Sequence, residues 1–199
     1  MKVAYGLKAH SGWAALVVLG KSDGEFVVVD RRRVELVEEE WARQPYHAAE
    51  ELDVNEARKL VKRGIDAAYR IATREIRAAL DRERKRKNDV AACAVLVGNP
   101  MPEWSVEQIL AVHFRMHQAE GVLFRDALIS AAQKCSLKVI ELPEKTLLSH
   151  ASEALRTPSA ELSQTISAIG KPIGPPWGKD QKDAAFAAMV ALGSKKFDR

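Results

Sequence analysis

Apolar residues near the N-terminus fall into blocks that are separated by short turn-like segments. Apolar side chains dominate residues 3–7 and 13–19, and residues 26–37 continue a β pattern with alternating polar positions. Turn-forming residues lie between these blocks, at 8–12 and 21–24. The pattern therefore predicts three strands joined by short loops, in an antiparallel meander.

The pattern becomes helical from residue 55 to residue 87. Apolar residues recur on one face, and arginine and lysine residues lie on the opposite face. A helix of this length would extend about 50 Å, with Gly64 as a possible bend. Residues 38–52, which precede the helix, show no regular pattern.

The rest of the chain alternates between strand and helix patterns. Residues 90–97 form a continuous apolar run, which is typical of an interior strand in a parallel sheet. A second short strand is predicted at 137–142, and Ser105 is a plausible N-cap for the helix between the two strands. The helices expected in this part of the chain are 105–135, 151–169, with a break near Pro158, and 180–192. This order of elements predicts an α/β fold with a mixed sheet and helices packed on it, in a single domain over residues 1–199.

The composition is that of an ordinary globular protein. Hydrophobic residues make up 47% and charged residues 29%, which excludes a disordered chain, a collagen and a disulfide-built miniprotein. Cys93 and Cys135 form no recognisable metal or redox motif and are expected to be buried small hydrophobes. No signal peptide and no membrane-spanning run is apparent, so we expect a reduced cytoplasmic protein without a membrane partner. The net charge of +4 allows a nucleic-acid partner without requiring one.

Three segments of the chain resemble sequence motifs of one nuclease family. Residues 3–14 look like its opening hairpin, and Gln-Ala-Glu-Gly at 118–121 is similar to its Gln-Ala-Arg-Gly helix. Residues 180–187 resemble its Asp-x-x-Asp-Ala-x-x-Ala helix. The chain thus resembles the RuvC-like branch of the RNase H-like superfamily, the relatives of Holliday-junction resolvases. The resemblance implies an RNase H-like fold, with three antiparallel strands followed by two parallel strands in one mixed sheet, and it implies a homodimer.

The resemblance also implies a set of carboxylates that bind two Mg²⁺ ions for phosphodiester cleavage. Asp180 and Asp183 match the position on the last helix, although a favourable interaction with the helix dipole is an alternative reason for them. Where the family has an aspartate on the first strand, this chain has Lys8, which cannot bind Mg²⁺. Lys8 could take the place of a metal ion electrostatically, or it could pair with Asp180 or Asp183. No carboxylate ends the fourth strand, and Glu103 is a candidate a few residues later.

Two departures from the family's acidic positions favour a degenerate nuclease that acts as a nucleic-acid-binding or scaffold protein, with no certain cofactor. One alternative is an active Mg²⁺- or Mn²⁺-dependent nuclease with a rearranged acidic set of Asp180, Asp183 and Glu103. The other alternative is a protein-interaction module that keeps only the fold. Divalent-metal binding separates the first two hypotheses, and salt-dependent DNA binding separates the first from the third.

The candidate nucleic-acid contacts are two basic clusters and one tryptophan: Arg31, Arg32, Arg33, Arg82, Arg84, Lys85, Arg86, Lys87 and Trp177. Solvated faces, a helix end and a protected sheet edge are the alternative explanations for the two clusters. Trp177 belongs to a Gly- and Pro-rich segment at 170–179. It either anchors this segment to the core or stacks on a base.

Two further groups of polar residues carry candidate chemistry. His113, His117 and Glu120 recur on one helical face, a spacing that can bind Zn²⁺ when another ligand completes the set. A partly exposed helical face is the alternative. Lys8 lies in one turn with His10 and Ser11, where the three could bind an anion or form an ordinary hairpin loop.

Overall fold

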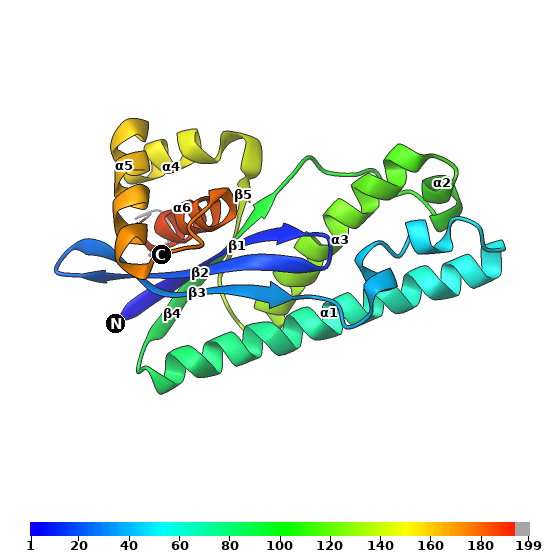
Figure 1. Cartoon of the computed structure of the whole chain (residues 1–199), viewed down its shortest axis with the longest axis horizontal. Coiled ribbons are helices and arrows are strands. Elements are labelled where there is room, and N and C mark those ends of the chain that lie inside the picture. The colour runs from blue at the N-terminus through cyan, green and yellow to red at the C-terminus, as the bar shows by residue number, and fades with distance from the viewer. Residues whose placement is uncertain (194–199) are drawn as a thin grey trace.

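A computed structural model, which describes residues 1–193, contains one five-stranded mixed sheet (Figure 1). Its strands are β1 (Lys2–His10), β2 (Trp13–Ser22), β3 (Glu25–Glu35), β4 (Asp89–Val97) and β5 (Val139–Pro143). The spatial order is β3-β2-β1-β4-β5. The first three strands pair antiparallel, whereas β4 pairs parallel with β1 and β5 pairs parallel with β4. The predicted mixed sheet, three antiparallel strands followed by two parallel ones, is confirmed.

Helices cover both faces of the sheet (Figure 1). On one face, α1 (Val54–Lys85) and α3 (His113–Lys134) bury the apolar side chains that β1 and β2 present to them. The other face is covered by α6 (Lys179–Gly193), together with α4 (Leu147–Leu155) and α5 (Ser159–Gly170). No helix among residues 1–193 is long and apolar enough to cross a membrane.

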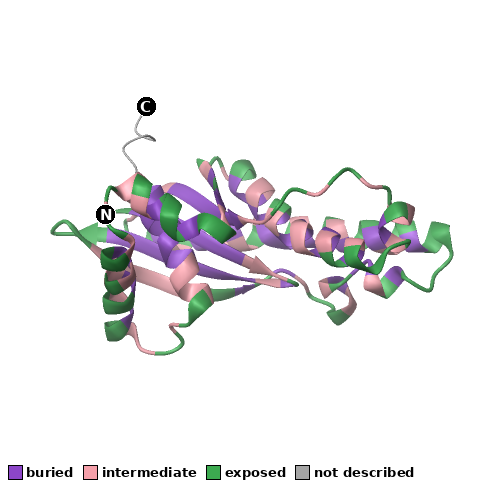
Figure 2. Cartoon of the chain, turned by 90° about the horizontal axis from the view of Figure 1, so that it is seen from above, coloured by how far each residue is buried: buried purple, intermediate pink, exposed green. Residues whose placement is uncertain are grey.

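A third apolar core lies beyond the sheet, where α1 and α3 extend past its edge (Figures 1 and 2). The segment between β3 and α1, which sequence left irregular, forms two 3₁₀ helices there, η1 (Glu40–Arg43) and η2 (His47–Ala49). The short helix α2 (Val106–Leu110) completes this extension. The residues buried in the third core are Tyr46, Ala49, Ala57, Val61, Ile109, Met116 and Ala119.

Two predicted helices are each divided in the structure. The helix expected at 105–135 is interrupted at Val112, whose backbone is extended, so that α2 and α3 are separate helices. Ser105 is confirmed as an N-cap, because it and Gln108 form a capping box at the start of α2. The helix expected at 151–169 starts earlier, and the break expected near Pro158 is confirmed, because α4 ends before Arg156, which has a left-handed backbone conformation, and α5 begins after Pro158.

The strand β1 and the helix α6 approach each other unusually closely. A Cβ atom on Gly6 would lie only 1.8 Å from the carbonyl oxygen of Ala184, so only glycine fits at this position. Helix α6 is buried over residues 184–191, and its alanine side chains are small enough to allow this close contact with β1. The close approach brings the start of α6 over Lys8, two residues after Gly6.

Both cysteines are free thiols. Cys93 is fully buried within β4, as expected, and burial raises the pKa of its thiol to about 12, which makes it unreactive. Cys135 follows α3 and is only partly buried.

Candidate functional site

A buried ammonium group lies among three carboxylates at the end of β1. The Nζ atom of Lys8 is 2.7 Å from Asp183 Oδ2, 3.0 Å from Glu144 Oε1 and 3.2 Å from Asp180 Oδ1. Lys8 itself is only 5% exposed. These four side chains are here called the Lys8 site.

Three separate elements build the Lys8 site. Side chains alternate along β1, so that Lys8 points to the same face as Gly6, towards α6. Asp180 and Asp183 lie three residues apart in the first turns of α6, on the side that meets β1. Because β1 and β5 run parallel, their carboxyl ends lie at the same edge of the sheet, and Glu144 directly follows β5.

Hydrogen bonds and ion pairs favour the charged forms of Lys8 and Asp180. Burial alone would lower the pKa of the Lys8 ammonium, but its hydrogen bonds to Asp183, Glu144 and Asp180 outweigh burial and raise the pKa. Burial raises the pKa of Asp180, but Lys8 and the nearby His10 outweigh it, so that the net shift is downward. The site therefore holds charges of both signs at neutral pH.

Further cationic and aromatic side chains surround the carboxylates. The Nζ atom of Lys179 lies 2.5 Å from Asp183 Oδ2, and His10 Nε2 lies 3.2 Å from Asp180 Oδ1. The His10 ring stacks on Trp13 with 4.3 Å between centroids, and the Arg33 guanidinium lies 3.9 Å from the centre of the Trp13 ring. Lys8 and His10 belong to β1 and not to the turn expected at residues 8–12, and since both face carboxylates they are not arranged to bind an anion.

A groove of about 700 Å³ opens beside the Lys8 site. Glu144 belongs to both the site and the groove lining, and Lys179, which pairs with Asp183 of the site, also lines the groove. The other residues that line this groove are Gly98, Asn99, Met101, Phe114, His117, Gln118, Gly121, Val122, Arg125 and Lys145. Three of the lining residues, Arg125, Lys145 and Lys179, are cations, so the groove presents positive charge next to the paired carboxylates.

Comparison with solved structures identifies the architecture. The structure of Thermus thermophilus RuvC matches with a TM-score of 0.51 and 14% identity, over 94% of this chain and 92% of that chain. T. thermophilus RuvC in complex with a Holliday junction substrate matches with a TM-score of 0.53 and 14% identity, over 94% and 91%. The chain has a RuvC-like RNase H fold.

A third match is the yeast mitochondrial Holliday junction resolvase Ydc2, with a TM-score of 0.42 and 10% identity, over 96% of this chain and 76% of that chain. No protein-family model matches the chain, and no curated protein sequence matches it.

The residues present do not fit the two Mg²⁺ ions that the RuvC-like resemblance implies. The carboxylates that would bind a cation already contact the Lys8 ammonium, within 3.2 Å for all three. Mg²⁺ requires a near-ideal shell of oxygen ligands, and an ammonium in the same place competes for their charge. Glu103 does not complete the set, because it is exposed on the loop that leads to α2, whereas Glu144 is the third carboxylate.

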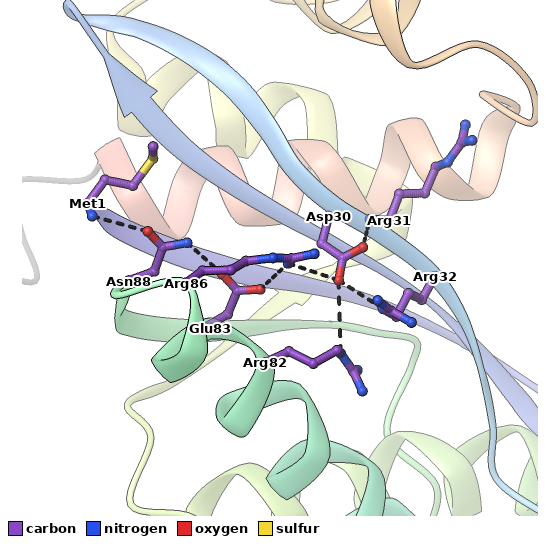
Figure 3. Close-up of polar contacts among 8 residues, drawn as sticks. All are labelled: Met1, Asp30, Arg31, Arg32, Arg82, Glu83, Arg86 and Asn88. Carbon is purple, nitrogen blue, oxygen red and sulfur yellow. Dashed lines mark hydrogen bonds and ion pairs between the residues drawn. The ribbon is translucent and has the colours of Figure 1, made fainter.

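Arg32 of one predicted basic cluster meets Arg82 and Arg86 of the other around Asp30, on the face of the RuvC-like sheet opposite to Lys8 (Figure 3). Asp30 accepts a 2.8 Å hydrogen bond from Arg32 Nε and one of 3.2 Å from Arg86, and Arg82 Nε lies 4.0 Å away. The buried Glu83 also accepts from Arg86, at 2.6 Å. Part of the positive charge in these clusters is therefore neutralised by the protein's own carboxylates.

The other members of the clusters have varied positions. Arg84 pairs with Asp81 at 3.1 Å, and Lys85 and Lys87 are exposed near the end of α1. Arg31 points away from Asp30 and donates to the carbonyl oxygens of Gly174, Pro175 and Pro176 (Figure 3). Strand alternation thus separates Arg32 from Arg31 and Arg33.

Trp177 packs into the core beside α6. Its Nε1 donates a 2.9 Å hydrogen bond to the carbonyl oxygen of Ile166, and a Cβ atom on Gly170 would clash with its ring. These contacts favour the interpretation that Trp177 anchors the loop before α6.

Sequence reasoning missed several residues at the site and groove. Glu144, Arg125 and Lys145 belong to no motif: Glu144 and Lys145 reach the site because they follow β5, which ends at the same edge of the sheet as β4, and Arg125 reaches the groove from α3. The acidic pair Asp180 and Asp183 was found through the resemblance, and their pairing with Lys8 was one of the alternatives considered.

Proposed function

We propose that this protein binds nucleic acid through the groove beside the Lys8 site and does not cut it by two-metal catalysis. The observation that carries the proposal is the buried Lys8 ammonium, which is paired with Glu144, Asp180 and Asp183. The RuvC-like resemblance implies a metal-binding aspartate at the position of Lys8. Because Lys8 stays protonated, its ammonium balances part of the charge of the three carboxylates without a divalent ion.

The groove supplies what recognition of nucleic acid requires. Arg125, Lys145 and Lys179 can neutralise successive phosphates. Phe114 lines the same groove and is 67% exposed, so that an unpaired base can stack on it. T. thermophilus RuvC was solved with a Holliday junction substrate, and a four-way DNA junction is therefore the first probe to use.

Calorimetric titration with Mg²⁺ and Mn²⁺ tests the absence of two-metal chemistry. We expect no binding at millimolar concentrations, either by the wild-type protein or by Asp183→Asn. The variant Lys8→Asp serves as the positive control, because it adds a carboxylate and removes the competing ammonium. Metal binding by the wild-type protein that is lost in Asp183→Asn, with metal-dependent cleavage of the junction, would overturn the proposal in favour of an active nuclease with a rearranged acidic site.

Titration of a fluorescent four-way junction at low salt tests the groove as the interface. We expect Arg125→Gln/Lys145→Gln to weaken binding about tenfold or more, because two phosphate contacts are lost. The matched double variant Arg84→Gln/Lys85→Gln removes the same number of cations from the end of α1 and should bind as the wild-type protein does. The reverse result would place the interface on the basic clusters. No binding by the wild-type protein would favour a protein-interaction module.

A further inference from the structure

Three histidines converge at the third core, outside the Lys8 site, and one of them, His47, is far from the other two in sequence. His47 lies in η2, and His113 and His117 lie one turn apart at the start of α3. One ring nitrogen from each lies within 4.8 Å of the other two. The ring centroids are 5.0 Å apart for His47 and His113, 4.6 Å for His47 and His117, and 4.8 Å for His113 and His117.

A buried carboxylate fixes the orientation of the His47 ring. Glu120 is 1% exposed, and its Oε2 lies 2.8 Å from His47 Nδ1. Its Oε1 also accepts hydrogen bonds of 3.1 Å from the backbone N–H groups of Tyr46 and His47. Because an ionised carboxylate only accepts hydrogen bonds, His47 Nδ1 is the donor, and in the neutral imidazole this leaves the lone pair on Nε2.

The lone pair on His47 Nε2 has no evident use within the protein. This atom is buried, and it has no hydrogen-bond partner among the residues that the structure describes. A buried polar atom without a partner is costly, so that a ligand bound to this nitrogen would remove the cost.

The spacing of the other two histidines matches that of metal ligands. His113 Nε2 and His117 Nε2 are 3.2 Å apart. Two nitrogens bound tetrahedrally to Zn²⁺ at about 2.0 to 2.1 Å are separated by roughly 3.3 to 3.4 Å. The two rings therefore already have the separation that one shared ion requires.

We propose that His47, His113 and His117 bind one Zn²⁺ ion. Glu120 is a positioning residue that orients His47, an arrangement common around protein-bound zinc. Three neutral imidazoles favour zinc and similar transition metals over Mg²⁺, which prefers oxygen ligands. A water molecule completes the tetrahedron at the exposed side of the cluster.

The zinc site has a structural consequence that is independent of the proposed nucleic-acid binding. It joins η2 to α3 across the third core, where only short elements cover the ends of the long helices. His117 also lines the groove, and His47 lines a separate hollow with Ser11 and Arg43. The ion therefore lies between two solvent-accessible surfaces, so that it can exchange with the solution.

Zinc titration of the whole chain, freed of metal with a chelator that is then removed, tests the proposal. We expect one Zn²⁺ per chain in competition with a chromogenic chelator, and a Co²⁺ absorption spectrum typical of four-coordinate sites. His113→Ala and His117→Ala should each weaken Zn²⁺ binding at least tenfold. Glu120→Gln should weaken it by about 10- to 100-fold, since the second-shell hydrogen bond to His47 is altered.

Matched variants separate this site from incidental binding. His150→Ala removes an exposed histidine on α4, and Cys135→Ser removes the partly exposed thiol; both should bind Zn²⁺ like the wild-type protein. His113 and His117 are exposed, so their variants should keep the wild-type circular dichroism spectrum. The proposal is overturned if the wild-type protein binds no Zn²⁺ at about 100 μM. It is equally overturned if the folded His113→Ala/His117→Ala variant binds one ion as tightly as the wild-type protein.

Discussion

At the scale of single residues, Lys8 determines the chemistry of the site. Its ammonium is the shared partner of Glu144, Asp180 and Asp183, so that removing it would leave three neighbouring carboxylates without their common cation. A metal ion could then take the place that the ammonium leaves. One substitution therefore tests whether this arrangement of carboxylates keeps any capacity for a divalent ion.

We predict that Lys8→Ala lowers the free energy of unfolding by about 2 kcal/mol, because the carboxylates repel one another and are only partly exposed. Millimolar Mg²⁺ should restore much of this loss, whereas it should leave the wild-type protein unchanged. Urea unfolding with and without Mg²⁺ measures both effects. The control is Lys59→Ala, which removes an exposed pair with Glu56 and should have a much smaller effect on stability, because water screens this pair. Equal stabilisation of the wild-type protein by Mg²⁺ would contradict the prediction.

Asp180 gives the site a defined response to acid. Its pKa is lower in the folded protein than its ordinary value of 3.8. Its contribution to stability is therefore fully present above that value and is lost as the pH falls through the folded pKa. We predict that the wild-type protein is more stable than Asp180→Asn at pH 7 and that the difference vanishes well below pH 3.8. Urea unfolding at a series of pH values checks this, and a difference that persists undiminished into acid would refute it.

At the scale of elements, the contact between β1 and α6 holds the site together. Gly6 has no room for a Cβ atom against the α6 backbone, so a side chain there must push the helix away from the sheet. We predict that Gly6→Ala destabilises the protein by about 3 kcal/mol or more. In contrast, Gly121→Ala in α3 meets no atom within 4 Å and should stabilise it by about 0.5 to 1 kcal/mol. Thermal unfolding of the two variants should therefore shift in opposite directions; similar shifts would show that the β1–α6 contact is easily relaxed.

Periodicity was sufficient to predict most of these elements. The apolar run of β4 and the one-sided pattern of α1 each have a single plausible interpretation, and the structure confirms both. The break at Val112 was not predictable, because no glycine or proline marks it and the packing of α2 in the third core decides it. The same holds for His47, which joins His113 and His117 only through tertiary structure. A spacing of i and i+4 shows which residues of one helix share a face, but not what meets that face.

At the scale of the whole molecule, the groove links the two candidate sites. Glu144 and Lys179 connect it to the Lys8 site, and His117 connects it to the histidine cluster. The helices α1, α2 and α3 form an extension beyond the sheet (Figure 2), and the histidine cluster belongs to this extension. The groove can therefore lie between the Lys8 site, at the sheet edge, and the histidines. A bound strand of nucleic acid that follows the groove would therefore pass along both sites.

The charge in the groove predicts how nucleic-acid binding depends on salt. If Arg125, Lys145 and Lys179 each neutralise one phosphate, the logarithm of the association constant should fall with the logarithm of salt concentration with a slope of about −3. Arg125→Gln should make this slope shallower by about 1, whereas Arg84→Gln should leave it unchanged. Fluorescence titration of a four-way junction at several salt concentrations measures the slopes. If Arg84→Gln changes the slope and Arg125→Gln does not, then the phosphates are neutralised at the end of α1 and the groove has another role.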